Sequence, residues 1–109
     1  MKAIDFEQID IHQAKELIDK GGLTIADVRD EDSYQRTHIP LAVSVSDDTL
    51  KSFLSQADKN KPLFCYCYHG HSSQSAAQYF SQQGFKKVYS IIGGFEKWRT
   101  NYPVTEEKT

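Results

Sequence analysis

The sequence has little of what membrane, secreted or nucleic-acid-binding proteins need. Its 109 residues include only two cysteines and carry a formal net charge of −2, from 13 basic and 15 acidic side chains. The apolar runs are a handful of residues long, far below the roughly 20 that span a bilayer. A chain without a basic excess lacks the electrostatic footprint for nucleic acid or anionic lipid. We therefore expect no nucleic-acid partner and no membrane partner.

The two cysteines, Cys65 and Cys67, are separated by one residue. At that spacing on a strand they point to the same face, and a disulfide between them would be strained. Because there is no disulfide framework and no apolar secretory core at the N-terminus, we expect a cytoplasmic protein. The length indicates one domain, assigned to residues 1–104 with a polar C-terminal tail at 105–109. The expected oligomeric state is a monomer or a weak homodimer.

Short β-rich runs alternate with segments of helical spacing. Strands are predicted within residues 6–9, 23–28, 42–45, 63–66 and 88–91. Helices are predicted after Asp10, at Asp30, after a cap at Asp47 or Asp48, at Gln74 and after Gly93-Gly94. Strands separated by helices lie too far apart for hairpins. The pattern predicts an α/β fold with a mainly parallel central sheet of about five strands and helices on both faces.

Two of the predicted strands end in chemically interesting residues. In parallel sheets with helices on both faces, ligands bind beyond the carboxyl ends of the strands. Asp27-Val28-Arg29 ends one strand and Cys67 follows another, so both segments are expected on one rim of the sheet. We interpret Asp27 and Arg29 as a structural ion pair rather than a catalytic pair.

The loop from Cys67 to Ser73 joins a predicted strand to a predicted helix. Backbone N–H groups of such a loop can converge on an anion, and the helix N-terminus adds a partial charge of about +0.5. Because the thiolate is the nucleophilic form of cysteine, Cys67 is the candidate catalytic residue. Gly70 would let the backbone bend inward. The candidate substrate-binding set is Tyr68, His69, Gly70, His71, Ser72 and Ser73.

Two other functions compete for this loop. Cys65, Cys67, His69 and His71 alternate along the chain, and thiolate with imidazole suits zinc or copper(I). Their spacing departs from the usual gaps between paired metal ligands, so we expect no metal and no other cofactor. A cysteine phosphatase would need a bidentate arginine where this chain has Ser73, which disfavours phosphate chemistry. Cys65 is interpreted as a small core residue.

Four segments resemble, in order, the signatures of the single-domain rhodaneses, a family of sulfurtransferases. They are Asp27–Asp30, Thr37–Ala42, Cys67–Ser73 and Gly93–Trp98. The resemblance implies a rhodanese-like domain that moves a sulfane sulfur from thiosulfate through a Cys67 persulfide and releases sulfite. The implied acceptors are cyanide or a dithiol protein such as thioredoxin.

This chain departs from the family pattern at three positions. Thr37 and Leu41 stand where the family segment has glycine, and His71 stands where the loop usually has asparagine. The loop also contains no arginine or lysine. Affinity for an anion would then depend on N–H groups, hydroxyls and the histidines.

Overall fold

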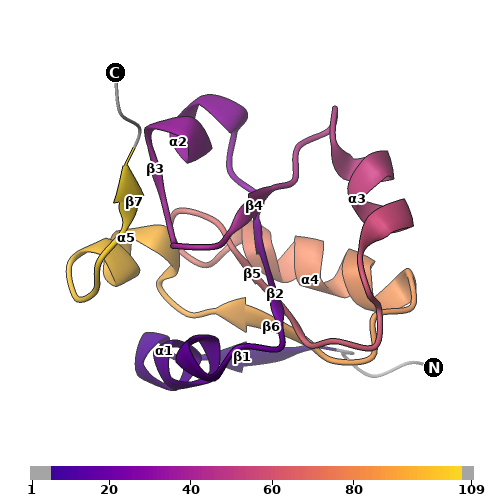
Figure 1. The fold of residues 1–109 in the computed structure, drawn as a ribbon, viewed down its shortest axis with the longest axis horizontal. Coiled ribbons are helices and arrows are strands. Elements are labelled where there is room, and N and C mark those ends of the chain that lie inside the picture. The colour runs from indigo at the N-terminus through magenta and orange to yellow at the C-terminus, as the bar shows by residue number, and fades with distance from the viewer. Residues whose placement is uncertain (1–5, 107–109) are drawn as a thin grey trace.

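Five short strands lie parallel to one another at the centre of the computed structural model, which describes residues 6–106 (Figure 1). Their order across the sheet is β1-β6-β5-β2-β4, and all four pairings are parallel. The strands are β1 (Glu7–Ile9), β2 (Thr24–Asp27), β4 (Val43–Ser44), β5 (Leu63–Tyr66) and β6 (Val88–Ile91). The prediction of a mainly parallel sheet of about five strands is confirmed.

Helices cover both faces of the sheet, as predicted. One face packs against α1 (Ile11–Lys20) and α5 (Gly94–Arg99), and the other against α3 (Leu50–Gln56) and α4 (Ser72–Gln82). Phe64 and Tyr66 of β5 belong to the first core, whereas Leu63 and Cys65 belong to the second. This alternation follows from the two-residue period of a strand, and it explains why β5 is apolar along its whole length.

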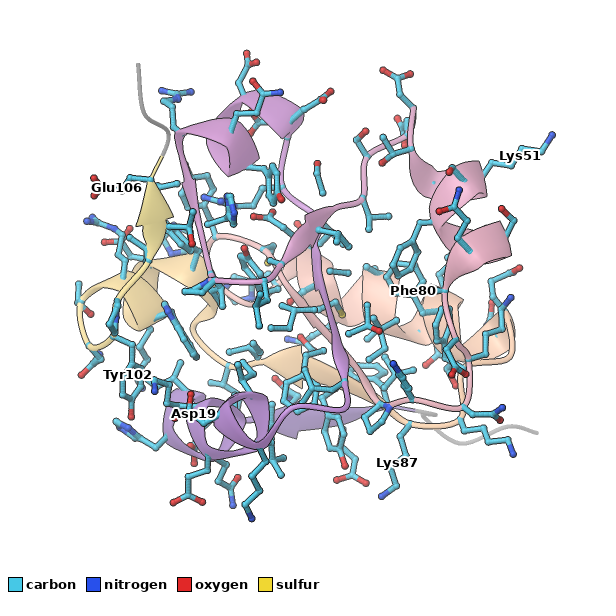
Figure 2. The ribbon with its side chains drawn as sticks, in the orientation of Figure 1. Asp19, Lys51, Phe80, Lys87, Tyr102 and Glu106 are labelled. Carbon is cyan, nitrogen blue, oxygen red and sulfur yellow. The ribbon has the colours of Figure 1, made fainter. Side chains whose placement is uncertain are left out.

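The second core is rich in aromatic contacts. Figure 2 shows Phe80 pointing from α4 into the space beside α3, whereas Lys51 extends from α3 into solvent. The ring of Phe80 meets Phe53 of α3 edge to face, with centroids 5.6 Å apart, and Phe85 at 5.8 Å. The three rings fix α3 and α4 against the sheet, and α4 is the helix that leads away from the Cys67 loop.

The helix caps agree with the sequence at α1 but not at α3. The Asp10 carboxylate accepts hydrogen bonds from the N–H groups of His12 and Gln13 at 2.9 and 2.8 Å. The expected cap at Asp47 or Asp48 is wrong, because α3 follows Thr49 and has no side-chain cap. The Thr49 hydroxyl accepts from the Ser46 N–H at 2.9 Å instead and holds the preceding turn. Both aspartates are therefore left exposed.

Ordered pairing extends beyond residue 104, where we expected the tail to begin. Strand β7 (Thr105–Glu106) pairs antiparallel with β3 (Thr37–His38), next to α2 (Glu31–Arg36). The indole N–H of Trp98 donates to the Pro103 carbonyl at 3.0 Å, within the turn that carries the chain from α5 to β7. The rest of the expected tail, 107–109, and the N-terminal residues 1–5 lie outside the described residues. Within residues 6–106, no helix is both long and apolar enough to cross a membrane.

Leu41, which follows β3 and stands where the family segment has glycine, has the positive φ that glycine adopts most readily. Its φ is +73°, and its side chain is 83% exposed. The left-handed region costs a residue with a Cβ about 1–2 kcal/mol, and an exposed side chain returns little packing energy. The turn at Leu41 is therefore strained in its backbone.

We expect Leu41→Gly to stabilise the protein by about 0.5–1 kcal/mol, because relief of strain exceeds the entropy that glycine adds to the unfolded chain. For a domain of this size, this corresponds to a rise in Tm of about 2–6 °C in a thermal melt. Leu41→Ala is the control, since it removes the exposed side chain but keeps the Cβ. An equal gain in both variants would contradict the role assigned to strain.

Candidate active site around Cys67

Cys67 lies directly after β5, at the carboxyl end of the sheet. It opens onto a cavity of about 240 Å³ between the loop and the segment that follows β2. The cavity is lined by Val28, Arg29, Asp30, Cys67, Tyr68, His69, His71 and Ser72. The prediction that the two strand ends share one rim is confirmed by this lining. Five of the seven candidate site residues line the cavity, and the other two, Gly70 and Ser73, contact the sulfur atom.

The Cys67 sulfur sits within a ring of hydrogen-bond donors. The backbone N–H groups of Gly70 and Ser73 each donate to Sγ at 3.2 Å. Sγ also lies 3.5 Å from the Ser73 hydroxyl, which in turn lies 2.8 Å from the hydroxyl of Ser90 on β6. Ser73 and Ser90 are fully buried. This arrangement suits a negative charge on sulfur, which accepts hydrogen bonds better than a neutral thiol does.

The two cysteines have opposite pKa shifts. Burial raises the pKa of the Cys67 thiol, but the hydrogen bonds from Ser73, Gly70 and His69 outweigh it, and the pKa lies below its ordinary value. Cys65 is fully buried beneath the loop, with its sulfur 3.4 Å from the Ser73 carbonyl oxygen. Burial there raises the thiol pKa, and the nearby Cys67 adds to the effect. Cys67 is therefore the thiol suited to act as a nucleophile.

The start of α5 orients the first peptide groups of the loop. The N–H groups of Phe95 and Glu96 donate to the carbonyl oxygens of Cys67 and Tyr68, at 2.8 and 3.0 Å. In a trans peptide, the N–H points opposite to the C=O. The N–H groups of Tyr68 and His69 are therefore turned away from α5, and that of His69 is one of the donors that lower the pKa of the Cys67 thiol.

Glycines permit the close approach of α5 and the loop. A Cβ on Gly94 would lie 2.5 Å from the Cys67 carbonyl oxygen, and one on Gly70 would lie 2.9 Å from the Gly93 nitrogen. Both residues also have positive φ, at +60° and +90°. The sequence indicated a turn at Gly93-Gly94 but not its contact with the loop. The signal was present, because a glycine pair after a strand also permits close backbone contact.

A buried ion pair supports the rim beside the loop. The Arg29 guanidinium contacts the fully buried Asp27 carboxylate at 2.7 Å and donates to the Thr37 carbonyl at 2.6 Å. The Tyr66 hydroxyl donates to Asp27 at 2.6 Å, and burial together with that carboxylate raises the pKa of Tyr66. The guanidinium lies 4.1 Å from the centre of the Phe95 ring. These contacts agree with the structural role expected for Asp27 and Arg29.

The histidines and tyrosine of the loop lie at the cavity mouth. His69 and His71 are exposed, and the Tyr68 side chain is 43% exposed, with its hydroxyl 3.3 Å from that of Ser33. Arg29 is the one basic side chain among the lining residues other than these histidines, and Asp27 neutralises it. The cavity thus offers N–H groups, hydroxyls and imidazoles to an anion, beside the exposed carboxylate of Asp30.

The metal alternative gains no support from the described chain. Across residues 6–106, no three or more His, Cys, Asp or Glu side chains are grouped so that they could hold a metal ion. Cys65 is sealed in the core, whereas His69 and His71 face solvent. The chain turns at Cys67, so the cysteine and histidine side chains that alternate in the sequence do not point to one common site.

These features define an α/β domain that presents an activated thiol in a strand–loop–helix turn at the rim of a parallel sheet. Residues 10–101 match the protein family whose description is "Rhodanese-like domain". The chain belongs to this rhodanese family.

Individual relatives extend the similarity over nearly the whole chain. A protein of Coxiella burnetii named thiosulfate sulfurtransferase GlpE is 50% identical over 101 residues, covering 93% of this chain and 94% of that one. A GlpE of Pseudomonas syringae is 46% identical over 99 residues, covering 91% and 92%. Among solved structures, the BH2092 protein of Bacillus halodurans is 33% identical with a TM-score of 0.79, covering 92% of this chain and 77% of that one. The Alr3790 protein of Anabaena has a TM-score of 0.83 at 25% identity, covering 93% and 94%.

We expect Ser73→Ala to raise the pKa of the Cys67 thiol by about half to one unit, because a donor to the thiolate is lost. The pH dependence of alkylation by iodoacetamide measures this pKa. The wild-type midpoint should fall below the ordinary value of about 8.5, and the variant midpoint should move upward. Ser72→Ala is the matched control, since Ser72 is exposed and begins the same helix. A midpoint unchanged by Ser73→Ala would contradict this assignment.

We expect Asp27→Asn to lower the free energy of unfolding by about 3–5 kcal/mol, because it leaves the Arg29 charge buried without its partner. Urea denaturation measures the change. Glu96→Gln is the control, since it breaks the solvent-exposed pair with Arg99 and should change stability little. Equal changes in the free energy of unfolding for the two substitutions would show that burial does not determine how much an ion pair contributes to stability.

Proposed function

We propose that this protein is a thiosulfate sulfurtransferase that carries a sulfane sulfur on Cys67. The observation that carries the proposal is the hydrogen-bonded sulfur of Cys67, whose pKa is lowered despite its burial. The names of the relatives from Coxiella and Pseudomonas support the same activity. The chain has Ser73 where a cysteine phosphatase needs arginine, so the phosphatase alternative remains disfavoured.

In the first half-reaction, the Cys67 thiolate attacks the outer sulfur of thiosulfate. A bond forms between Sγ and that sulfur while the sulfur–sulfur bond of thiosulfate breaks. Sulfite leaves with the electron pair, and Cys67 becomes a persulfide anion. No general base is needed, because the nucleophile is already ionised and sulfite is a good leaving group. The charge moves from Sγ to the outer sulfur, so it stays within reach of the loop N–H groups.

In the second half-reaction, an acceptor removes the outer sulfur and restores the Cys67 thiolate. Cyanide attacks that sulfur and leaves as thiocyanate. A dithiol protein of the thioredoxin kind attacks with one thiolate, and its second thiol then displaces hydrosulfide and forms a disulfide. Each route splits one transfer into two easier displacements, so ping-pong kinetics are expected. No cofactor takes part in either half-reaction.

The proposed substrate-binding residues are Tyr68, His69, Gly70, His71, Ser72 and Ser73. Gly70 and Ser73 would act through backbone N–H groups, and the others through side chains at the cavity mouth. A cavity of about 240 Å³ has room for a small dianion beside Sγ. We further propose a single-domain protein located in the cytoplasm, as a monomer or weak homodimer. Two free thiols suit a reducing compartment.

We expect incubation with thiosulfate to add one sulfur atom to the protein, about 32 Da in an intact-mass measurement, and cyanide to remove it. Cys67→Ser should fold normally and show no adduct. Cys65→Ser is the matched control, because its thiol is buried and its pKa is raised, and it should still gain the sulfur. A cyanide-labile adduct that persists in Cys67→Ser would overturn the assignment of the nucleophile.

A further inference from the structure

A second, larger groove of about 720 Å³ adjoins the cavity above Cys67. The two hollows share three lining residues, Val28, Arg29 and Asp30, which follow β2. The groove runs from this shared wall toward the ends of β4 and α3 on one side and along α4 on the other. A small dianion in the cavity leaves this groove empty, so the first half-reaction gives it no role.

The floor of the groove is apolar. Buried Val45 and Phe80 lie at its base, and Leu50 and Ala76 line it with partly exposed side chains. Tyr79 of α4 adds an aromatic wall that is 38% exposed. Burial of such a floor under the apolar side chains of a partner would stabilise a complex.

The rim of the groove is acidic. Four carboxylate residues line it, Asp30, Glu31, Asp47 and Asp48, and all four are exposed. Arg29 is the one basic residue in the lining, and Asp27 pairs with it. Hydrogen bonds from Ser33 lower the pKa of Asp30, so its carboxylate is ionised at neutral pH. The groove therefore attracts cations and repels thiosulfate and sulfite.

We propose that this acceptor groove binds the sulfur-accepting protein, through a segment whose reactive cysteine is flanked by apolar and cationic side chains. The proposal rests on the sulfurtransferase function and names the chemistry of the second substrate. The shared wall would hold the flanking residues in the groove while the thiol enters the cavity. Charge complementarity would also raise the association rate at low ionic strength.

The same cationic side chains suit the acceptor for its chemistry. A positive neighbour lowers the pKa of a thiol and increases its thiolate fraction. The acceptor thiolate forms a bond to the outer sulfur of the Cys67 persulfide, the bond from that sulfur to Sγ breaks, and the electron pair returns to Cys67. The acceptor leaves as a persulfide, and no external oxidant or reductant is required.

The test compares two synthetic pentapeptides with one central cysteine, Lys-Leu-Cys-Leu-Lys and Glu-Leu-Cys-Leu-Glu, as acceptors from the persulfidated protein. We expect the basic peptide to discharge the persulfide at least about tenfold faster in low salt, with the difference shrinking as salt rises. The protein variant that isolates the groove is Asp47→Asn/Asp48→Asn, which removes two exposed carboxylates. It should slow discharge by the basic peptide at least about threefold, but it should slow neither persulfide formation nor discharge by cyanide.

The matched control is Glu7→Gln/Glu16→Gln, which makes the same change in net charge at a hollow beside β1 and α1. A rate for the basic peptide that is unchanged in Asp47→Asn/Asp48→Asn, or lowered equally in the control, would overturn the proposal. Each peptide is measured with both double variants. A difference between the variants for the same peptide therefore cannot come from the intrinsic reactivity of that peptide.

A second measurement does not depend on sulfur transfer. Titration of the wild-type protein with Lys-Leu-Ser-Leu-Lys, followed by NMR, should give saturable shifts at Leu50 and Tyr79, and Asp47→Asn/Asp48→Asn should weaken this binding at least about threefold. Absence of those shifts would overturn the acceptor groove even if persulfide forms. Saturable shifts in a protein that never forms a persulfide would instead overturn the sulfurtransferase function alone.

Discussion

The buried carboxylate of Asp27 is the constraint on which the arrangement of the rim depends. A charge without access to water must be paired and hydrogen-bonded, and here its partners come from separate parts of the chain. Arg29 follows β2 itself, and Tyr66 lies at the end of β5. Through them the network reaches Thr37 and Ile39, whose backbone groups bond to Arg29 and Tyr66. The requirement to satisfy one carboxylate thus brings the elements around Cys67 into a single arrangement.

Reactivity at the site results from competition between desolvation and hydrogen bonding. Both thiols lie on the face of the sheet covered by α4, and both contact Ser73. The Cys65 thiol donates a hydrogen bond to a carbonyl oxygen, which stabilises the neutral form. Cys67 meets N–H donors, which stabilise the thiolate. Cys65 and Cys67 are only two residues apart, but β5 ends between them. The first sulfur therefore faces a hydrogen-bond acceptor and the second faces donors.

Sequence patterns predicted those parts of the structure that local residues determine. The sheet, the helix after Asp10 and the position of Cys67 follow from periodicity, capping and strand ends. The cap of α3 did not, because Thr49 competes with Asp47 and Asp48 through contacts to the preceding turn that the sequence does not display. The pairing of Thr105–Glu106 with β3 is a long-range contact of two polar residues, with no apolar pattern to indicate it. The acidic groove likewise gathers residues from three separate segments.

The contact between Gly94 and the loop carbonyls also sets the mutational tolerance of the chain. Every other amino acid at this position would place a Cβ 2.5 Å from the Cys67 oxygen, so either α5 or the loop would have to move. Gly21 also has a positive φ, yet open space surrounds its missing Cβ. A side chain at the end of α1 would therefore meet backbone strain alone, because φ +81° with ψ −171° is a region essentially limited to glycine, whereas one at the start of α5 would also clash with the loop. Gly94 takes no part in the chemistry, yet its lack of a side chain is required for the loop that holds the Cys67 thiol.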